Sequence, residues 1–75
     1  MPTFFFNQDC PRRETTDLVG RELPNSAAAV LHAQTMARAI LKSQLRTGER
    51  PNGSVRIEDE QHRPLVTVLI RFAGD

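Results

Sequence analysis

The chain has 75 residues, which is enough for one small domain and near the lower limit for folding without a further stabilising device. Ten basic and nine acidic residues give a net charge of +1 and a pI of about 8.0, below the value of about 9 that is usual for nucleic-acid-binding domains. Cys10 is the only cysteine, which excludes an internal disulfide bond. One cysteine with two distant histidines, His32 and His62, also lacks the spacing of a zinc site.

The composition favours a cytoplasmic protein. The longest apolar segment, Leu65 to Ile70, is too short to span a bilayer, so we expect no membrane association. The opening Met1-Pro2-Thr3 has no basic region and no cleavage site, so we expect no secretory signal. Asn52-Gly53-Ser54 matches a glycosylation acceptor, but Asn52-Gly53 is typical of a turn, and we prefer that interpretation.

The first third of the chain predicts a hairpin and an ordered connection. Three phenylalanines favour a strand over residues 3–7, with Phe5 on the face opposite Phe4 and Phe6. Residues 8–12 carry turn chemistry, and residues 13–16 can form a short second strand. In the connection over residues 17–24, we expect Gly20 to adopt a positive φ and three apolar side chains to contact the core, namely Leu18, Val19 and Leu23.

The middle of the chain predicts one helix that begins near Ala27. Asn25 or Ser26 can cap its first turn, and Gly48 suits a left-handed cap at its end. One stripe of the helix is apolar and rich in alanine, which would let it lie close to a sheet. The stripe consists of Ala29, Val30, Ala33, Met36, Ala37, Ile40 and Leu41.

The last third predicts a second hairpin, with strands over residues 54–58 and 65–72 and a polar turn between them. The whole chain is therefore expected to be a single α+β domain over residues 1–75. Its order is β-β-α-β-β, and its sheet is mainly antiparallel with the helix packed on one face. Because the first and last strands are the most apolar, we place both in the centre, which gives the strand order 2-1-4-3.

The face of the sheet away from the helix would carry an apolar patch with a basic rim. We take four of its residues as a candidate protein interface, namely Phe5, Leu65, Leu69 and Arg71. Apolar patches often mark association surfaces, although scattered exposed apolar residues are also normal. A free edge strand would offer a second docking surface, through strand addition. The partner would be a second copy of the chain or a different protein.

Basic residues form a stripe on the helix, and they support an alternative function. Arg38, Lys42 and Arg46 recur every four residues, and the helix contains no acidic residue. Such a stripe could follow the phosphates of a nucleic acid. Cations near a helix C-terminus also interact favourably with the helix dipole, and we prefer this structural interpretation.

The sequence does not predict an enzyme or a cofactor. Cys10 with His32 or His62 could supply a nucleophile and a base, but Cys10 lies beside Pro11 in a turn, and we expect an exposed thiol without a role. The acidic cluster Glu58-Asp59-Glu60 lacks the ligand pattern of a calcium loop. The four glycines are isolated, so no phosphate-binding loop is present. The function we expect is a protein-interaction or regulatory module without catalysis.

The order of motifs resembles a bacterial family of small stand-alone proteins whose function is unknown. The resemblance rests on Phe4-Phe5-Phe6, the segment Asp17-x-x-Gly20-x-Glu22-Leu23-Pro24, the alanine-rich start of the helix, Asn52-Gly53 and Leu65-Val66-Thr67-Val68. It implies a β-β-α-β-β fold and carries no activity or catalytic residue. This chain departs from the family in having Phe4 in place of tyrosine and Asn7 in place of histidine or aspartate. It also has Gln61-His62 where Asp-Gly is usual.

Overall fold

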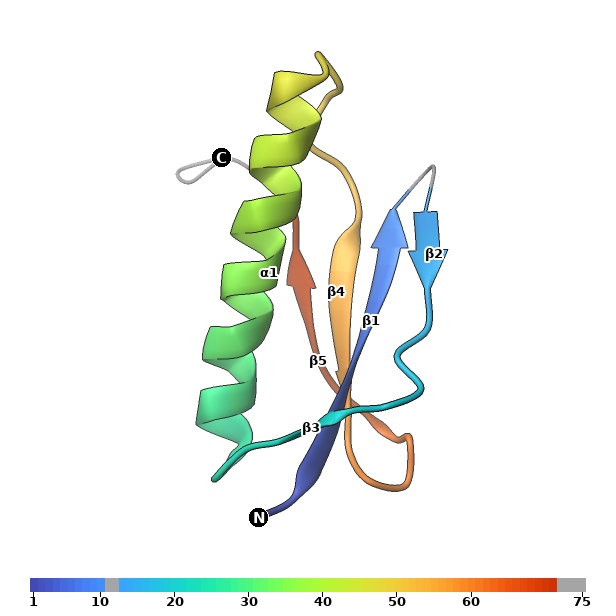
Figure 1. Ribbon diagram of the computed structural model, residues 1–75, viewed down its shortest axis with the longest axis vertical. Coiled ribbons are helices and arrows are strands. Elements are labelled where there is room, and N and C mark those ends of the chain that lie inside the picture. Colours follow the sequence, from blue (N-terminus) through green and yellow to red (C-terminus); the bar gives the residue numbers. More distant parts are fainter. Residues whose placement is uncertain (11–12, 72–75) are drawn as a thin grey trace.

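The computed structural model describes residues 1–10 and 13–71, which form an open antiparallel sheet with one long helix on one face (Figure 1). Along the chain, the strands are β1 (Thr3–Cys10), β2 (Arg13–Thr15) and β3 (Arg21–Glu22). The helix α1 (Ser26–Arg46) follows, and then the strands β4 (Ser54–Glu58) and β5 (Pro64–Leu69). The expected α+β fold is confirmed, with the two-residue strand β3 as an addition. Phe72, which the sequence assigns to the last strand, lies outside the described residues.

The sheet order is β2-β1-β4-β5, and β3 pairs with β1 beyond the end of β2. The predicted order was wrong, because β4 and not β5 pairs with β1. The prediction counted apolar residues on both faces of each strand. A central strand of this sheet needs only one apolar face, because the helix covers one face and the other is open. Val55 and Ile57 of β4 meet that need, since both are fully buried.

The core lies between the sheet and the apolar stripe of α1. Phenylalanines 4 and 6, Cys10, Ile70 and the two β4 residues are buried against three alanines of the helix, Ala29, Ala33 and Ala37. These alanines are 0 to 6 % exposed, so the helix lies close to the sheet as the sequence predicts. The other four residues of the predicted stripe pack against this core and are partly buried.

Both ends of α1 are capped by local hydrogen bonds. Asn25 is the N-cap, because its side chain accepts from the backbone N–H of Ala28. At the other end Gly48 has a φ of +80°, and the N–H groups of Gly48 and Glu49 donate to the carbonyls of Leu45 and Gln44. This pattern is a Schellman motif, and it confirms the predicted glycine cap.

Candidate functional site

The outer edge of β5 is the longest unpaired strand edge in the described part of the chain. Ile70 donates its backbone N–H to Gly53, on the β4 side of the hairpin. Alternate residues of an antiparallel strand bond to opposite sides, so the N–H and C=O groups of Thr67 and Leu69 point away from β4. Five of the six residues of β5 are exposed, and none of the six is charged. The edge therefore offers backbone donors and acceptors beside exposed apolar side chains.

The opposite side of the sheet is closed by short, charged strands. β2 has three residues and β3 has two, and both contain arginine and glutamate. Short length and charge are the usual protection of a sheet edge against further pairing. The two sides of the sheet therefore differ, and only β5 is open to a further strand.

The structure divides the four residues of the predicted interface. Leu65 and Leu69 are 45 % and 58 % exposed, and Arg71, two residues after the end of β5, is also exposed. Phe5 is only partly exposed, and its ring stacks on the imidazole of His62 at a centroid distance of 4.2 Å. The exposed apolar side chains of the predicted interface thus belong to β5, whereas Phe5 is only partly exposed and stacks on His62.

A groove lies between the β5 edge and the neighbouring side of α1, with a cavity volume of about 180 Å³. Its apolar lining consists of Ala37, Leu41, Val68 and Leu69, and its polar lining consists of Gln34, Arg38 and Arg71. Arg38 belongs to the predicted basic stripe of the helix and Arg71 to the predicted interface. The groove brings these two arginines together, although the sequence alone assigns them to separate surfaces.

The basic stripe of the helix is exposed along its length. Arg38, Lys42 and Arg46 are all exposed, and none makes an ion pair with another described residue. Of the three, only Arg38 lines the groove. Lys42 and Arg46 therefore lie outside the candidate site.

Asp17 closes a gap in the pairing of β1. β2 pairs with residues 8–10 of β1, and β3 pairs with residues 3–4 of β1. Phe6 lies between these two paired segments. One carboxylate oxygen of Asp17 accepts the backbone N–H of Phe6 at 3.1 Å. The other oxygen accepts the N–H groups of Val19 and Gly20 at 3.1 and 2.9 Å. The Asp17 N–H in turn donates to the side-chain oxygen of Asn7 at 2.8 Å, so Asn7 has a structural partner here.

Burial raises the pKa of Asp17, but the hydrogen bonds from Gly20, Phe6 and Val19 lower it by more, and His32 adds to the lowering. The pKa therefore lies below its ordinary value of 3.8. The turn that these bonds stabilise directs Leu18 and Val19 into solvent, where they are 84 % and 87 % exposed. The prediction that these two side chains contact the core was wrong, whereas Leu23 does pack against it.

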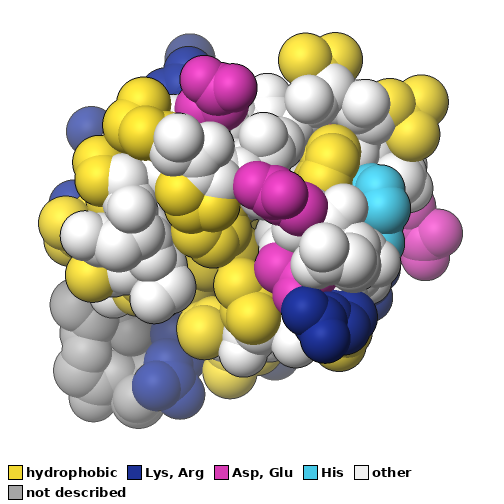
Figure 2. Space-filling view, turned by 90° about the horizontal axis from the view of Figure 1, so that it is seen from below, with side chains coloured by type: hydrophobic (Ala, Val, Ile, Leu, Met, Phe, Trp, Pro, Cys, Tyr) yellow, Lys and Arg dark blue, Asp and Glu magenta, His cyan; other side chains and the backbone are white. Residues whose placement is uncertain are grey.

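A second pocket, with a cavity volume of about 450 Å³, lies beside this turn and is lined by Leu18, Val19, Met36 and His32 among others. The His32 ring makes an edge-to-face contact with Phe6, at a centroid distance of 4.7 Å. Burial lowers the pKa of His32, and the positive charge of Arg21 lowers it further against the opposing effect of Asp17. The pKa of the partly buried His32 ring therefore lies below its ordinary value of 6.5. Apolar side chains also reach the surface at the end of the molecule seen in Figure 2, with acidic and basic groups between them.

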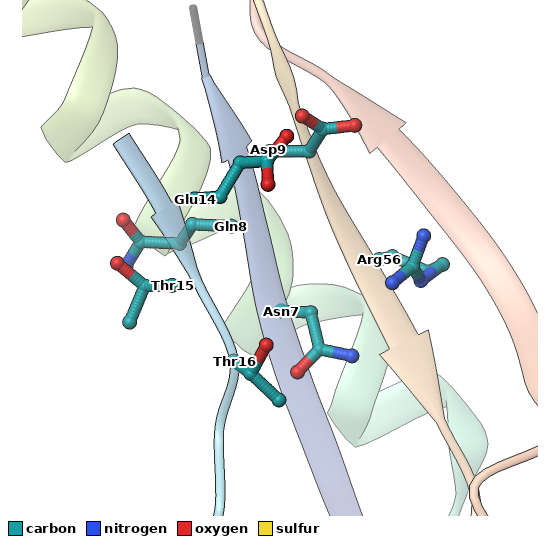
Figure 3. Close-up of a pocket in the computed structure, with 7 residues that line it drawn as sticks. All are labelled: Asn7, Gln8, Asp9, Glu14, Thr15, Thr16 and Arg56. Carbon is teal, nitrogen blue, oxygen red and sulfur yellow. The ribbon is translucent and has the colours of Figure 1, made fainter. Parts of the chain in front are cut away.

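The open face of the sheet carries a shallow polar pocket with a cavity volume of about 210 Å³ (Figure 3). It is lined by Asn7, Gln8, Asp9, Glu14, Thr15, Thr16 and Arg56. Asp9 is the cross-strand partner of Glu14, and Asn7 is the partner of Arg56. Among residues 1–10 and 13–71, no three histidine, cysteine, aspartate or glutamate side chains are grouped so that they could hold a metal ion.

The thiol of Cys10 is buried, so the expectation of an exposed thiol was wrong. It lines a pocket with residues of β1 and of the end of α1, namely Gln8, Ile40, Ser43, Gln44, Thr47 and Glu49. Neither histidine lines this pocket. The structure therefore does not assemble the nucleophile and base that the sequence raised as an alternative.

Residues 3–71 match the model of a family described as Domain of unknown function (DUF6894). The chain belongs to this family. The expected membership of a family of unknown function is confirmed, while its bacterial origin stays a prediction. No curated protein and no solved structure matches the chain. No helix within the described part of this DUF6894 chain is long and apolar enough to cross a membrane.

The segment Asp17-x-x-Gly20-x-Glu22-Leu23-Pro24 of this DUF6894 domain has a structural role, as the sequence suggested. Gly20 has a φ of +76°, and an added Cβ would lie 2.6 Å from the Thr3 side chain. Glu22 pairs with Thr3, and the Leu23 N–H donates to the carbonyl of Pro2. The segment thus fastens the chain to the start of β1 before α1 begins.

Proposed function

We propose that this DUF6894 domain is a protein-interaction module without catalysis, and that it binds an extended polypeptide segment by strand addition to β5. The observation that carries the proposal is the outer edge of β5, which is uncharged, apolar and unpaired by any described strand. In strand addition, backbone hydrogen bonds give affinity and the neighbouring side-chain pockets give specificity. The groove beside α1 offers such a pocket.

Two features of the fold support this choice of edge. Natural proteins usually protect a long edge strand with charge, proline or a bulge. Here Pro64 and the register shift opposite Ile57 and Glu58 lie at the beginning of β5 and leave Val66 to Leu69 without such a device. The pairing of β4 with both β1 and β5 also holds the edge on a rigid sheet.

The proposal is tested with a short peptide of alternating valine and threonine, added to isotopically labelled protein. We expect the backbone amides of Thr67 and Leu69 to shift and to become protected from hydrogen exchange, because these amides point away from β4. Thr67→Pro removes an outward donor while leaving the inward pairing intact, and it should abolish the effect. Leu69→Lys places a charge on the same edge and should weaken it. Shifts confined to the residues around Phe5 would contradict strand addition.

A second candidate function is nucleic-acid binding, because Arg38, Lys42 and Arg46 are exposed and unpaired among the described residues. In that case affinity for an oligonucleotide would fall steeply with salt. Each substitution of one of these residues by glutamine would reduce the slope of that dependence by about one. Binding that does not depend on salt, or that survives the triple substitution, would contradict this function.

A further inference from the structure

Among the described residues, the charged side chains that line the β5 groove are all positive. α1 and β5 contain no acidic residue, and Arg38 and Arg71 both line the groove. Both arginines are exposed, and neither makes an ion pair with another described residue. The groove therefore carries two positive charges that the described part of the chain does not compensate.

The two arginines of the β4–β5 hairpin, by contrast, are compensated. The guanidinium of Arg56 lies 3.6 Å from the carboxylate of Glu58, and that of Arg63 lies 2.9 Å from the carboxylate of Asp59. Arg38 and Arg71 have no such partner among the described residues, and they lie at the strand edge where backbone donors and acceptors are also unpaired. A ligand that meets both needs is a polypeptide with negative side chains.

We propose that the segment that adds to β5 is acidic, with glutamate or aspartate side chains that enter the groove and pair with Arg38 and Arg71. This inference rests on the proposed function and specifies its partner. The methylene stem of a glutamate can lie on the apolar lining formed by Ala37, Leu41 and Val68, while its carboxylate reaches the arginines at the rim.

A second copy of the chain fits the groove less well than an acidic segment. Antiparallel pairing of two β5 edges would place two helices without acidic residues side by side, so that Arg38 and Arg71 of each copy approach cations of the other. Like charges brought together at an interface oppose association. A different protein with an acidic strand meets no such repulsion.

The test compares three short peptides, in which valine alternates with glutamate, with glutamine or with lysine. Affinity and the protection of the Thr67 and Leu69 amides are measured for each peptide at low salt. We expect the glutamate peptide to bind about fivefold more tightly than the glutamine peptide, because two exposed ion pairs contribute, and we expect the lysine peptide to bind most weakly.

Charge-reversed variants assign the preference to the groove. Arg38→Glu and Arg71→Glu should each reduce the preference for the glutamate peptide, and the double variant should favour the lysine peptide. Arg46→Glu is the matched control, because it changes the net charge equally on an exposed helix position outside the groove. Arg38→Gln provides a milder change if the reversal alters the helix content seen by circular dichroism.

The outcomes separate this inference from the proposed function. Equal protection of Thr67 and Leu69 by all three peptides would leave strand addition standing and overturn the acidic preference. No protection by any peptide would overturn both. Protection that grows with protein concentration in the absence of peptide would assign the edge to a second copy and overturn the inference. The inference would also be overturned by an oligonucleotide that displaces the glutamate peptide and whose affinity depends on Arg46.

Discussion

The carboxylate of Asp17 accepts three backbone N–H groups, and the lowered pKa makes its contribution to stability depend on pH. A carboxyl whose pKa is lower in the folded state stabilises that state above its ordinary value near 3.8. The contribution is lost as the pH falls through the lowered folded value. We expect Asp17→Ala to reduce the free energy of unfolding at pH 7 by about 1–3 kcal/mol, because three backbone donors, two of them partly buried, lose a charged acceptor.

Urea unfolding at pH 7 and at a pH well below 3.8 checks this expectation, because the difference between the variant and the wild type should shrink in acid. Asp9→Asn is the control, since Asp9 is an exposed carboxylate on the neighbouring strand. An effect of Asp17→Ala that is the same at both pH values would assign the loss to packing and not to the charged hydrogen bonds.

His62 combines an unfavourable backbone conformation with a favourable ring contact. Its φ is +62°, in the left-handed region, and its ring stacks on Phe5. The backbone conformation costs roughly 1–2 kcal/mol for a residue other than glycine, and an aromatic pair contributes about 0.5–1.5 kcal/mol beyond the area it buries.

We expect His62→Ala to destabilise the protein by about 1 kcal/mol, because it removes the stack and keeps the strain. His62→Gly removes both and should leave the stability within about 0.5 kcal/mol of the wild type. Thermal unfolding of the two variants distinguishes the two terms. Equal losses for both would show that the left-handed conformation carries no cost at this turn.

At the start of α1, the sequence alone allows either Asn25 or Ser26 to be the N-cap. Substituting each residue tests which of them caps the helix. Asn25→Ala should reduce the free energy of unfolding by about 1 kcal/mol, since the Asn25 side chain accepts the Ala28 N–H. Ser26→Ala should have almost no effect and is the matched control. Urea denaturation measures both, and a larger loss for Ser26→Ala would contradict the capping geometry.

For the whole molecule, the unprotected β5 edge predicts a tendency to associate on heating. Leu69→Lys should reduce light scattering after partial unfolding while leaving the urea midpoint nearly unchanged, because a charged edge opposes pairing with another chain. Leu18→Lys is the control, since Leu18 is more exposed than Leu69 but does not lie on the edge. Equal protection by both variants would indicate a general effect of charge.

The sequence predicted the local elements well and their arrangement less well. The helix, its glycine cap and the second hairpin follow from propensity and period, which depend on neighbouring residues. The neighbours of β1 depend on pairing between distant residues, and apolar content does not determine it when one face of the sheet is open. The outward direction of Leu18 and Val19 depends on backbone hydrogen bonds that the Asp17 carboxylate accepts, which a hydrophobic pattern does not reveal.

The same distinction applies to the candidate site. Leu65, Leu69 and Arg71 could be chosen from the sequence because they are apolar or basic on the face away from the helix. Their grouping with Arg38 could not be predicted, because it requires β5 to be the edge strand beside α1. Phe5 was assigned to the same patch, but its contact with His62 depends on the shape of the turn between β4 and β5.

The pairing of β1 with β4 also determines the order in which the fold can form. It joins Asp9 to Ser54 and Phe5 to Glu58. Along the sequence, the helix and both of its flanking connections therefore separate the two central strands. Contacts between such distant residues are slow to form, because a long loop must close first. During synthesis β1 leaves the ribosome before β4 exists, and its three phenylalanines then lack their covering partners. The growing chain therefore has an interval in which chaperone binding, and not native pairing, would prevent aggregation.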